Sequence, residues 1–307
     1  MNKVQKPINT PLLKVYDQVR NNTIYFKDET KQYTNAFKYR GVYNKFSKID
    51  LTNYNGVITA STGNHGQAVS LVAKQLEIKC SIVIPHSTPT IKREKIKKNG
   101  AIIIDYEELT DYDKCSNYAI EKSKEDNLLY IPSFDDQDII DGHKTLFDEI
   151  PYTYDYCFCP VGGGGLISAA LTNRKLNNTK IIGVEIEEQD SMNQSLINHE
   201  IISVNIKQDN NSFCEGILVK KVGNLNFKIA LENNLNMTTV TINDIKESIK
   251  RLNKLNIVAE GAGASSYAAY LNSNIKNSSI LCVISGGNID KYVFKSIVEE
   301  RDLWNLE

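Results

Sequence analysis

Short apolar runs alternate with amphipathic stretches along the chain from residue 55 onward. Between the runs, apolar residues recur at helical spacing, as at Ala68, Leu71, Val72 and Leu76. Continuous β-branched runs separated by helices are typical of mostly parallel sheets that are covered on both faces. The pattern therefore predicts an α/β fold. The predicted strands cover residues 56–59, 80–85, 101–104, 128–131, 156–161, 180–186, 238–242 and 279–284.

Turn and cap residues mark where several helices begin and end. Thr110 opens a T-x-x-D pattern for a helix that runs to Lys122, and another helix is expected over 136–149. Asn99-Gly100 is a good C-terminal cap for the basic helix before it. The segment 199–226 has the least regular pattern, so we expect a long loop there.

The charge balance and the lengths of the apolar runs exclude several classes of protein. The 307 residues include 36 basic and 37 acidic ones, for a net charge of -1. Such a chain has no electrostatic reason to bind nucleic acid or an anionic membrane surface. Its apolar runs are far shorter than the ~20 residues of a membrane-spanning helix. The first residues, 1–7, lack the apolar block of a signal peptide, so we expect a cytoplasmic protein.

Cysteine and histidine spacing gives no metal-binding pattern. No Cys-x-x-Cys pair occurs, and Cys157 and Cys159 would point to the same face of one strand. The four histidines are dispersed along the sequence. We therefore expect reduced thiols that serve as small core residues. The six cysteines are Cys80, Cys115, Cys157, Cys159, Cys214 and Cys282.

Three loops that follow predicted strands have unusual compositions: Ser61–Gly66, Gly162–Gly165 and Ser285–Asn288. In parallel α/β sheets, ligands bind at loops beyond the carboxyl ends of the strands. Four consecutive glycines let successive backbone N–H groups converge on one anion at the start of a helix, which is a phosphate cradle. A flexible turn is the alternative. The run has neither the Walker nor the dinucleotide-binding spacing, which argues against a nucleotide-binding oxidoreductase.

Lys38 is a candidate reactive amine. It lies between Phe37 and Tyr39 and is followed by a second cation, Arg40. A lysine in such surroundings can have a lowered pKa, form a Schiff base and move protons. Taken alone the signal is weak, because most lysines are exposed surface groups.

Taken together, these motifs resemble the fold type II (β-family) pyridoxal-phosphate enzymes, and within them the serine/threonine dehydratase and serine racemase branch. The resemblance runs in the family's order along almost the whole chain. The matching stretches are Thr10-Pro11-Leu12, Ala36 to Gly41, Ser61 to Ala68, Phe134-Asp135-Asp136, Gly142 to Thr145, Pro160 to Leu166, Glu260 to Ala264, and Ser285 to Asn288.

The resemblance implies a tryptophan-synthase-β-like fold with two open, mostly parallel twisted sheets flanked by helices. A small domain over 53–144 would be inserted in a large cofactor-binding domain made of 1–52 and 145–307. The active site would lie between the domains, and the protein would be a homodimer acting on a small-molecule amino acid.

The resemblance also implies roles for individual residues toward pyridoxal 5'-phosphate. Lys38 would form the Schiff base and remove the Cα proton, with Phe37 packed against the ring. Asn64 would donate to the phenolate oxygen and Ser285 would bond the ring nitrogen. The cofactor phosphate would be held by Gly162, Gly163, Gly164, Gly165 and Leu166. The substrate carboxylate would be received by the backbone of Ser61, Thr62, Gly63, Asn64 and His65.

The chain departs from the family pattern in places. Ala36 stands where the family usually has serine, and Cys214-Glu215-Gly216 where A-D-G is common. A subset of the branch binds a divalent cation, and Glu185 fits its first ligand. Ser191 occupies the third position, with Asp190 one place off. A divalent cation at Glu185, a monovalent cation and a rearranged site are the alternatives.

Two activities fit this framework. The first is an ammonia-lyase (dehydratase) that removes the hydroxyl of serine, threonine or 3-hydroxyaspartate by β-elimination to give an oxo acid and ammonia. The second is an amino-acid racemase in which Lys38 and Thr62 work on opposite faces of the cofactor, since a hydroxyl at Thr62 can reprotonate Cα. A non-catalytic ligand-binding protein that kept the fold is a third possibility.

Overall fold

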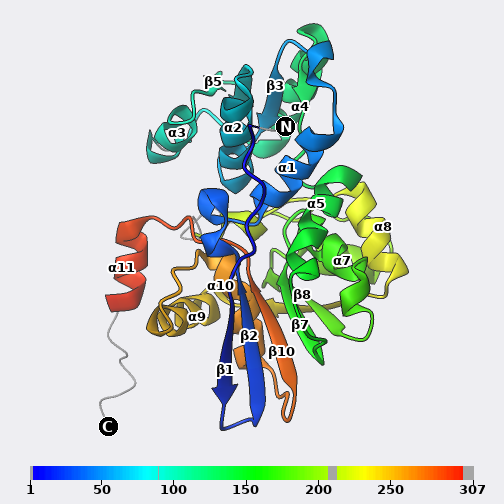
Figure 1. Cartoon of the computed structure of the whole chain (residues 1–307), viewed down its shortest axis with the longest axis vertical. Helices are drawn as coiled ribbons and strands as arrows, with labels where there is room; N and C mark the ends of the chain where they lie inside the picture. The colour runs from blue at the N-terminus through cyan, green and yellow to red at the C-terminus, as the bar shows by residue number, and fades with distance from the viewer. Residues whose placement is uncertain (1–2, 89, 207–212, 300–307) are drawn as a thin grey trace.

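The computed structural model describes residues 3–88, 90–206 and 213–299 and contains two sheets flanked by helices (Figure 1). One sheet has six strands in the order β1-β2-β10-β7-β8-β9. Their bounds are β1 Leu12–Asp17, β2 Asn22–Asp28, β10 Ser279–Ile284, β7 Tyr156–Pro160, β8 Lys180–Ile186 and β9 Asn236–Val240. Only the β1–β2 pair is antiparallel within this sheet.

The second sheet has four parallel strands in the order β5-β4-β3-β6. The strands are β3 Val57–Ala60, β4 Cys80–Val83, β5 Ile102–Ile104 and β6 Leu129–Tyr130. Both sheets are therefore mostly parallel, as the apolar pattern predicts. The helices are α1 Lys38–Lys48, α2 Asn64–Leu76, α3 Thr90–Lys97, α4 Tyr112–Glu125, α5 Gln137–Asp148, α6 Gly165–Leu171, α7 Ser191–Asn198, α8 Asn224–Glu232, α9 Ile242–Lys254, α10 Gly261–Asn272 and α11 Lys291–Glu299.

Helices cover both faces of each sheet, which explains why the central strands, such as β3, β7 and β10, are buried and largely apolar. On the larger sheet, Phe158 and Cys282 face α9 and α10 on one side, while Cys157 and Leu281 face α5, α6 and α8 on the other. Figure 1 shows α9 and α11 on the left of this sheet and α7 and α8 on its right. The smaller sheet is covered by α1 and α2 on one face and by α4 on the other.

The apolar face of α1 belongs to the same buried cluster as the smaller sheet: Tyr39, Val42 and Phe46 pack with Val57 and other strand and α2 residues. Helix α1 also packs extensively on α5. The division of the chain into 53–144 and the remainder stays a prediction.

The structure corrects several local predictions. The N-cap of α4 is Asp111, whose side chain accepts from the Lys114 N–H at 3.0 Å, and not Thr110. Strand β9 ends at Val240, because Thr241 forms a capping box that starts α9. The predicted loop 199–226 contains the 3-10 turn Glu215–Ile217 and the start of α8; residues 207–212 lie outside the described residues.

All six cysteines are free and buried, as expected for small core residues. Burial raises the pKa of the Cys157 thiol to about 12, so this side chain is chemically inert at neutral pH. Among the described residues, no helix has the length and apolar character needed to cross a membrane.

Candidate active site

Lys38 is the first residue of α1. Its Nζ donates to the Ser133 carbonyl oxygen at 2.6 Å and lies 5.2 Å from the centre of the Phe37 ring. Burial lowers the pKa of the Lys38 amine from 10.5 to about 8, because the surroundings disfavour the charged form. A far larger share of this amine than of an ordinary lysine is therefore neutral near pH 7, as a nucleophile or base requires.

The tetraglycine run connects β7 to α6. Gly164 has a φ of 97°, in the left-handed region that glycine adopts without strain. Within the described part of the chain, the backbone N–H groups of residues 162–166 donate no hydrogen bond, although 163–166 are buried. Buried N–H groups without partners are costly. A row of them at the start of a helix is suited to an anion such as a phosphate.

Phe134 connects Lys38 to the tetraglycine run. A Cβ on Gly163 would lie 2.3 Å from the Phe134 ring, so the absent side chain leaves room for that ring. Asn226 on α8 bonds both residues of this contact. Its Nδ2 donates to the Gly163 carbonyl at 2.8 Å and to the Phe134 carbonyl at 3.2 Å. Since Ser133 accepts from Lys38, the lysine and the glycine run share one supporting segment.

The loop between β3 and α2 presents a second set of backbone donors. The N–H groups of Thr62, Asn64 and His65 have no partner within the described residues, whereas the Gly63 N–H bonds the Ser61 hydroxyl at 3.2 Å. No atom other than those of the chain neighbours lies within 4 Å of a Cβ built on Gly63, so this loop has open space beside it. The arrangement is suited to a small anion such as a carboxylate.

The loop after β10 lies directly against the segment that carries Lys38. The Phe37 N–H donates to the Ser285 carbonyl at 3.0 Å, and Ala36 and Gly286 form an isolated β-bridge. Asn288 of this loop donates to the Asn64 side-chain oxygen at 2.7 Å, and Ser133, which accepts from Lys38, donates to the Ala60 carbonyl at 3.3 Å. The three loops singled out in the sequence are thus brought together around one lysine. Sequence separation hides this, because Lys38 and Ser285 come from opposite ends of the chain.

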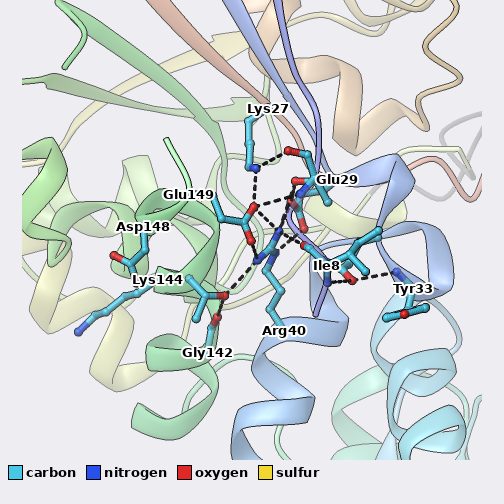
Figure 2. A network of polar contacts seen from close by, with 12 residues as sticks. Ile8, Lys27, Glu29, Tyr33, Arg40, Gly142, Lys144, Asp148 and Glu149 are labelled. Carbon is cyan, nitrogen blue, oxygen red and sulfur yellow. Dashed lines mark hydrogen bonds and ion pairs between the residues drawn. The ribbon is translucent and has the colours of Figure 1, made fainter. Parts of the chain in front are cut away.

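A largely buried ionic cluster surrounds Arg40, two residues after Lys38 on α1 (Figure 2). Arg40 on α1 donates to Glu29 at 2.7 Å and to Glu149 at 2.6 Å, and Lys27 also bonds Glu149 at 2.5 Å. The Thr10 hydroxyl donates to Glu29 at 2.5 Å. The cluster joins the N-terminal segment, β2, α1 and α5, so it fixes the start of the helix that carries Lys38.

Comparison with known proteins shows the family. The family described as "Pyridoxal-phosphate dependent enzyme" matches residues 5–286. The chain belongs to this family.

Individual members of the family resemble this chain over nearly its full length. It is 36% identical over 301 residues to a biosynthetic L-threonine dehydratase of Staphylococcus epidermidis, covering 93% of this chain and 70% of that protein. Its structure is similar to that of threonine deaminase isoform 2 from Solanum lycopersicum, with a TM-score of 0.84, 33% identity, and coverage of 97% and 89%. Maize serine racemase gives a TM-score of 0.83 at 27% identity, with coverage of 94% and 91%.

The site of this family member fits the family's cofactor. The N–H groups of 162–166, which have no partner within the described residues, offer a place for the phosphate. The Lys38 amine, whose pKa is lowered, is suited to react with a carbonyl carbon. The His65 ring is turned away, since its Nε2 lies 3.2 Å from the Ile131 carbonyl. Only the backbone of His65 is therefore available to a ligand carboxylate.

The contacts of Glu185 in this structure are not those of a cation ligand. Its two carboxylate oxygens accept from the Met192 and Asn193 N–H groups at 2.8 and 2.9 Å, at the start of α7. Burial raises the pKa of Glu185 to about 8 against the effect of these bonds. No group of three or more His, Cys, Asp or Glu side chains suited to a metal occurs in residues 3–88, 90–206 and 213–299. The expectation of a divalent cation here is not supported.

Several residues of the site carry no sequence signal of their role; His143 lies in the matching stretch Gly142 to Thr145, but nothing there assigns it a function. Ser133 and Asn226 carry no motif signal, and Asn226 falls in the stretch expected to be a loop. His143 on α5 packs its ring 4.6 Å from that of Phe37, and both of its ring nitrogens lack partners within the described chain. Burial, and then the nearby Lys38 charge, hold the pKa of His143 well below its usual range, so this histidine is neutral.

Proposed function

We propose that this protein is a pyridoxal-phosphate-dependent ammonia-lyase acting on a small β-hydroxy amino acid, with threonine and serine as the first substrates to test. The proposal rests on one observation. Lys38, whose amine has a lowered pKa, bonds Ser133, and the adjacent Phe134 packs against the tetraglycine run, whose N–H groups have no partner within the described residues. Threonine dehydratase and threonine deaminase among the similar proteins favour this reaction over other reactions of the family.

The chain's own residues divide the work as follows. Gly162, Gly163, Gly164, Gly165 and Leu166 hold the cofactor phosphate through their N–H groups. When bound, the cofactor supplies an electron sink that makes the Cα proton of the substrate removable.

The remaining groups bind and orient around Cα. Lys38 holds the cofactor and, once released, takes the Cα proton at its Nζ. The loop 61–65 would receive the substrate carboxylate, Asn64 and Ser285 would bond polar atoms of the cofactor ring, and Phe37 would pack beside it. Location in the cytoplasm and assembly as a homodimer stay predictions that rest on the sequence and its resemblance.

The proposal is tested with purified protein loaded with pyridoxal phosphate. We expect L-threonine or L-serine to give the corresponding oxo acid and ammonia, with 3-hydroxyaspartate as a further candidate. Lys38→Ala is expected to abolish turnover and the absorbance of the covalently bound cofactor, while Lys48→Ala, on the exposed end of the same helix, retains both. Equal turnover by wild type and Lys38→Ala would show that the proposal is wrong.

Racemisation is the second candidate, and Thr62 favours it. Its hydroxyl lies in the loop that receives the carboxylate, and serine racemase is among the similar structures. A racemase needs an acid on the face opposite the lysine. Incubation in deuterated water with L- and D-serine measures exchange and inversion at Cα. We expect Thr62→Ala to lose any inversion while elimination persists, and Thr62→Ser to keep both; inversion retained in Thr62→Ala would remove this role.

A further inference from the structure

The side-chain amide of Asn64, the first residue of α2, is held at both ends. Its Nδ2 donates to Oε1 of Glu260 at 2.7 Å. Its Oδ1 accepts from Nδ2 of Asn288 at 2.7 Å, and that same Nδ2 also donates to the Thr34 carbonyl at 2.7 Å. Both hydrogens of the Asn288 amide are therefore used. One N–H of Asn64 remains without a partner among the described residues.

These contacts permit only one orientation of the Asn64 amide. A flipped amide would place its NH2 group against the NH2 of Asn288, two donors facing each other. While Glu260 is ionised, the flipped amide would also place its oxygen against the Glu260 carboxylate, two acceptors facing each other. A donor or acceptor left facing a group of its own kind loses its hydrogen bond, which destabilises that orientation. Glu260 and Asn288 thus ensure that Asn64 offers a donor, and not an acceptor, to a ligand.

The neighbouring backbone is shaped to allow the Glu260–Asn64 bond. A Cβ on Gly286 would lie 2.7 Å from Oε1 of Glu260 and 3.2 Å from Nδ2 of Asn64, so any side chain there would displace the pair. The Glu260 N–H donates to the Gly286 carbonyl at 3.0 Å, which ties α10 to this glycine. Hydrogen bonds therefore hold Glu260, the loop Ser285–Asn288 and the start of α2 together.

Glu260 is a buried acid whose charge responds to its surroundings. The groups that face it are Asn64 from α2, Cys214 and Glu215 from the segment 213–217, the Asn288 N–H, and Lys95 from α3. Burial raises the pKa of Glu260 from 4.5 to about 7, with Glu215 adding to the rise and the Asn64 bond opposing it. The strength of the bond that holds Asn64 therefore changes near neutral pH, because an ionised carboxylate is the better acceptor.

We propose that Glu260 and Asn288 are positioning residues that orient Asn64, and that the ionisation of Glu260 sets how firmly the free Asn64 N–H is held toward an oxygen of the bound cofactor. The inference rests on the proposed function, since it concerns the same site. Neither residue touches the reacting atoms; both act through the Asn64 amide.

The test follows the absorbance spectrum of the bound pyridoxal phosphate as pH is raised through neutrality, with no substrate present. In wild type we expect a spectral step with a midpoint near 7, the pKa of Glu260. Glu260→Gln keeps the shape and one acceptor but cannot ionise, so the step should vanish while the cofactor stays bound. Asn288→Ala should weaken cofactor affinity about tenfold, because the Asn64 amide that faces the cofactor loses the partner that fixes its oxygen. A melting temperature close to that of wild type shows that each variant is folded.

Glu215→Gln provides a matched control, and it also tests the inference if Glu260→Gln fails to fold. Glu215 is a surface acid, paired with Lys92, that does not bond Asn64. Removing its charge should shift the step to lower pH without abolishing it, because a like charge beside Glu260 is gone.

The outcomes separate the two proposals. A wild-type protein that binds no cofactor contradicts the proposed function. If the cofactor binds, three results would each overturn the role of Glu260. The spectral step is absent in wild type, it persists in Glu260→Gln, or it keeps its midpoint in Glu215→Gln.

Discussion

The guanidinium of Arg40 donates through Nε to the Glu29 carboxylate at 2.7 Å, and neither side chain is exposed to solvent. Glu29 carries no other positive partner at ion-pair distance within the described residues, and its Oε1 also accepts from Thr10. A buried charge that loses its partner keeps the whole cost of its desolvation. The pair therefore contributes strongly to holding α1, and with it Lys38, in place within the ionic cluster.

Replacing Glu29 by Gln should lower the free energy of unfolding by about 3–5 kcal/mol, because the Arg40 charge then lacks one of its two buried carboxylates. Chemical denaturation of the protein without cofactor measures this. Lys48→Ala, which removes partly exposed ion pairs to Asp138 and Asp141, should cost less than about 1 kcal/mol. Equal losses in the two variants would contradict the importance of burial.

Gly63 and Gly163 should respond in opposite ways to a methyl group. A Cβ on Gly63 meets no atom within 4 Å, so Gly63→Ala should leave the melting temperature unchanged and raise the KM of the amino acid about tenfold by obstructing its carboxylate. A Cβ on Gly163 would collide with the Phe134 ring, so Gly163→Ala should lose on the order of 2 kcal/mol of stability together with cofactor binding. Thermal melts and steady-state kinetics distinguish these outcomes; a large loss of stability in Gly63→Ala would show that the space is filled.

The lowered pKa of Lys38 should be measurable by chemical labelling without cofactor. With a pKa of about 8, roughly a tenth of this amine is neutral at pH 7, far more than for a lysine of ordinary pKa 10.5. Its rate of reductive methylation should rise with pH and level off above 8. Lys48, on the same helix, has a pKa raised by its bond to Asp138 and serves as the control. Peptide mapping by mass spectrometry reports both; equal rates would contradict the effect of burial.

Glu185 should make the stability depend on pH. Its pKa is raised from 4.5 to about 8 in the folded protein, so the folded state holds this proton more tightly than the unfolded state does. The resulting stabilisation is fully present below pH 4.5 and is lost as pH rises through 8, by on the order of 5 kcal/mol at most. Denaturation of wild type and Glu185→Gln across this range should show the difference in unfolding free energy changing in favour of the variant; a constant difference would contradict the raised pKa.

Much of the fold follows from the apolar pattern, because strands buried on both faces leave continuous apolar runs. The pattern does not predict the β1–β2 hairpin, since β1 is an edge strand with mostly exposed or half-buried residues. Nor does it predict α8, whose residues follow the least regular part of the chain. The apolar pattern thus predicts buried helices and strands, and its signal is weaker where an element is partly exposed.

The residues of the candidate site also differ in how far the sequence predicts them. Lys38 and the three loops are visible in the sequence because glycine runs and helix starts have local signatures. The bond between Asn64 and Glu260 joins residues 196 positions apart, and only the packing of α2 against the loop after β10 brings them together. Such partners follow from tertiary structure alone.

The backbone clamp between residues 36–37 and 285–286 has a consequence for how enzymes of this kind diversify. The clamp uses the Phe37 N–H, the Ser285 carbonyl and the Ala36–Gly286 bridge, none of which depends on the side chain at 285. A single codon change there can exchange the hydroxyl for another group while the lysine two residues beyond Ala36 stays in place. Under the roles proposed for Ser285 and Lys38, selection can thus alter the electronic environment of the ring and the position of the base independently, one mutation at a time.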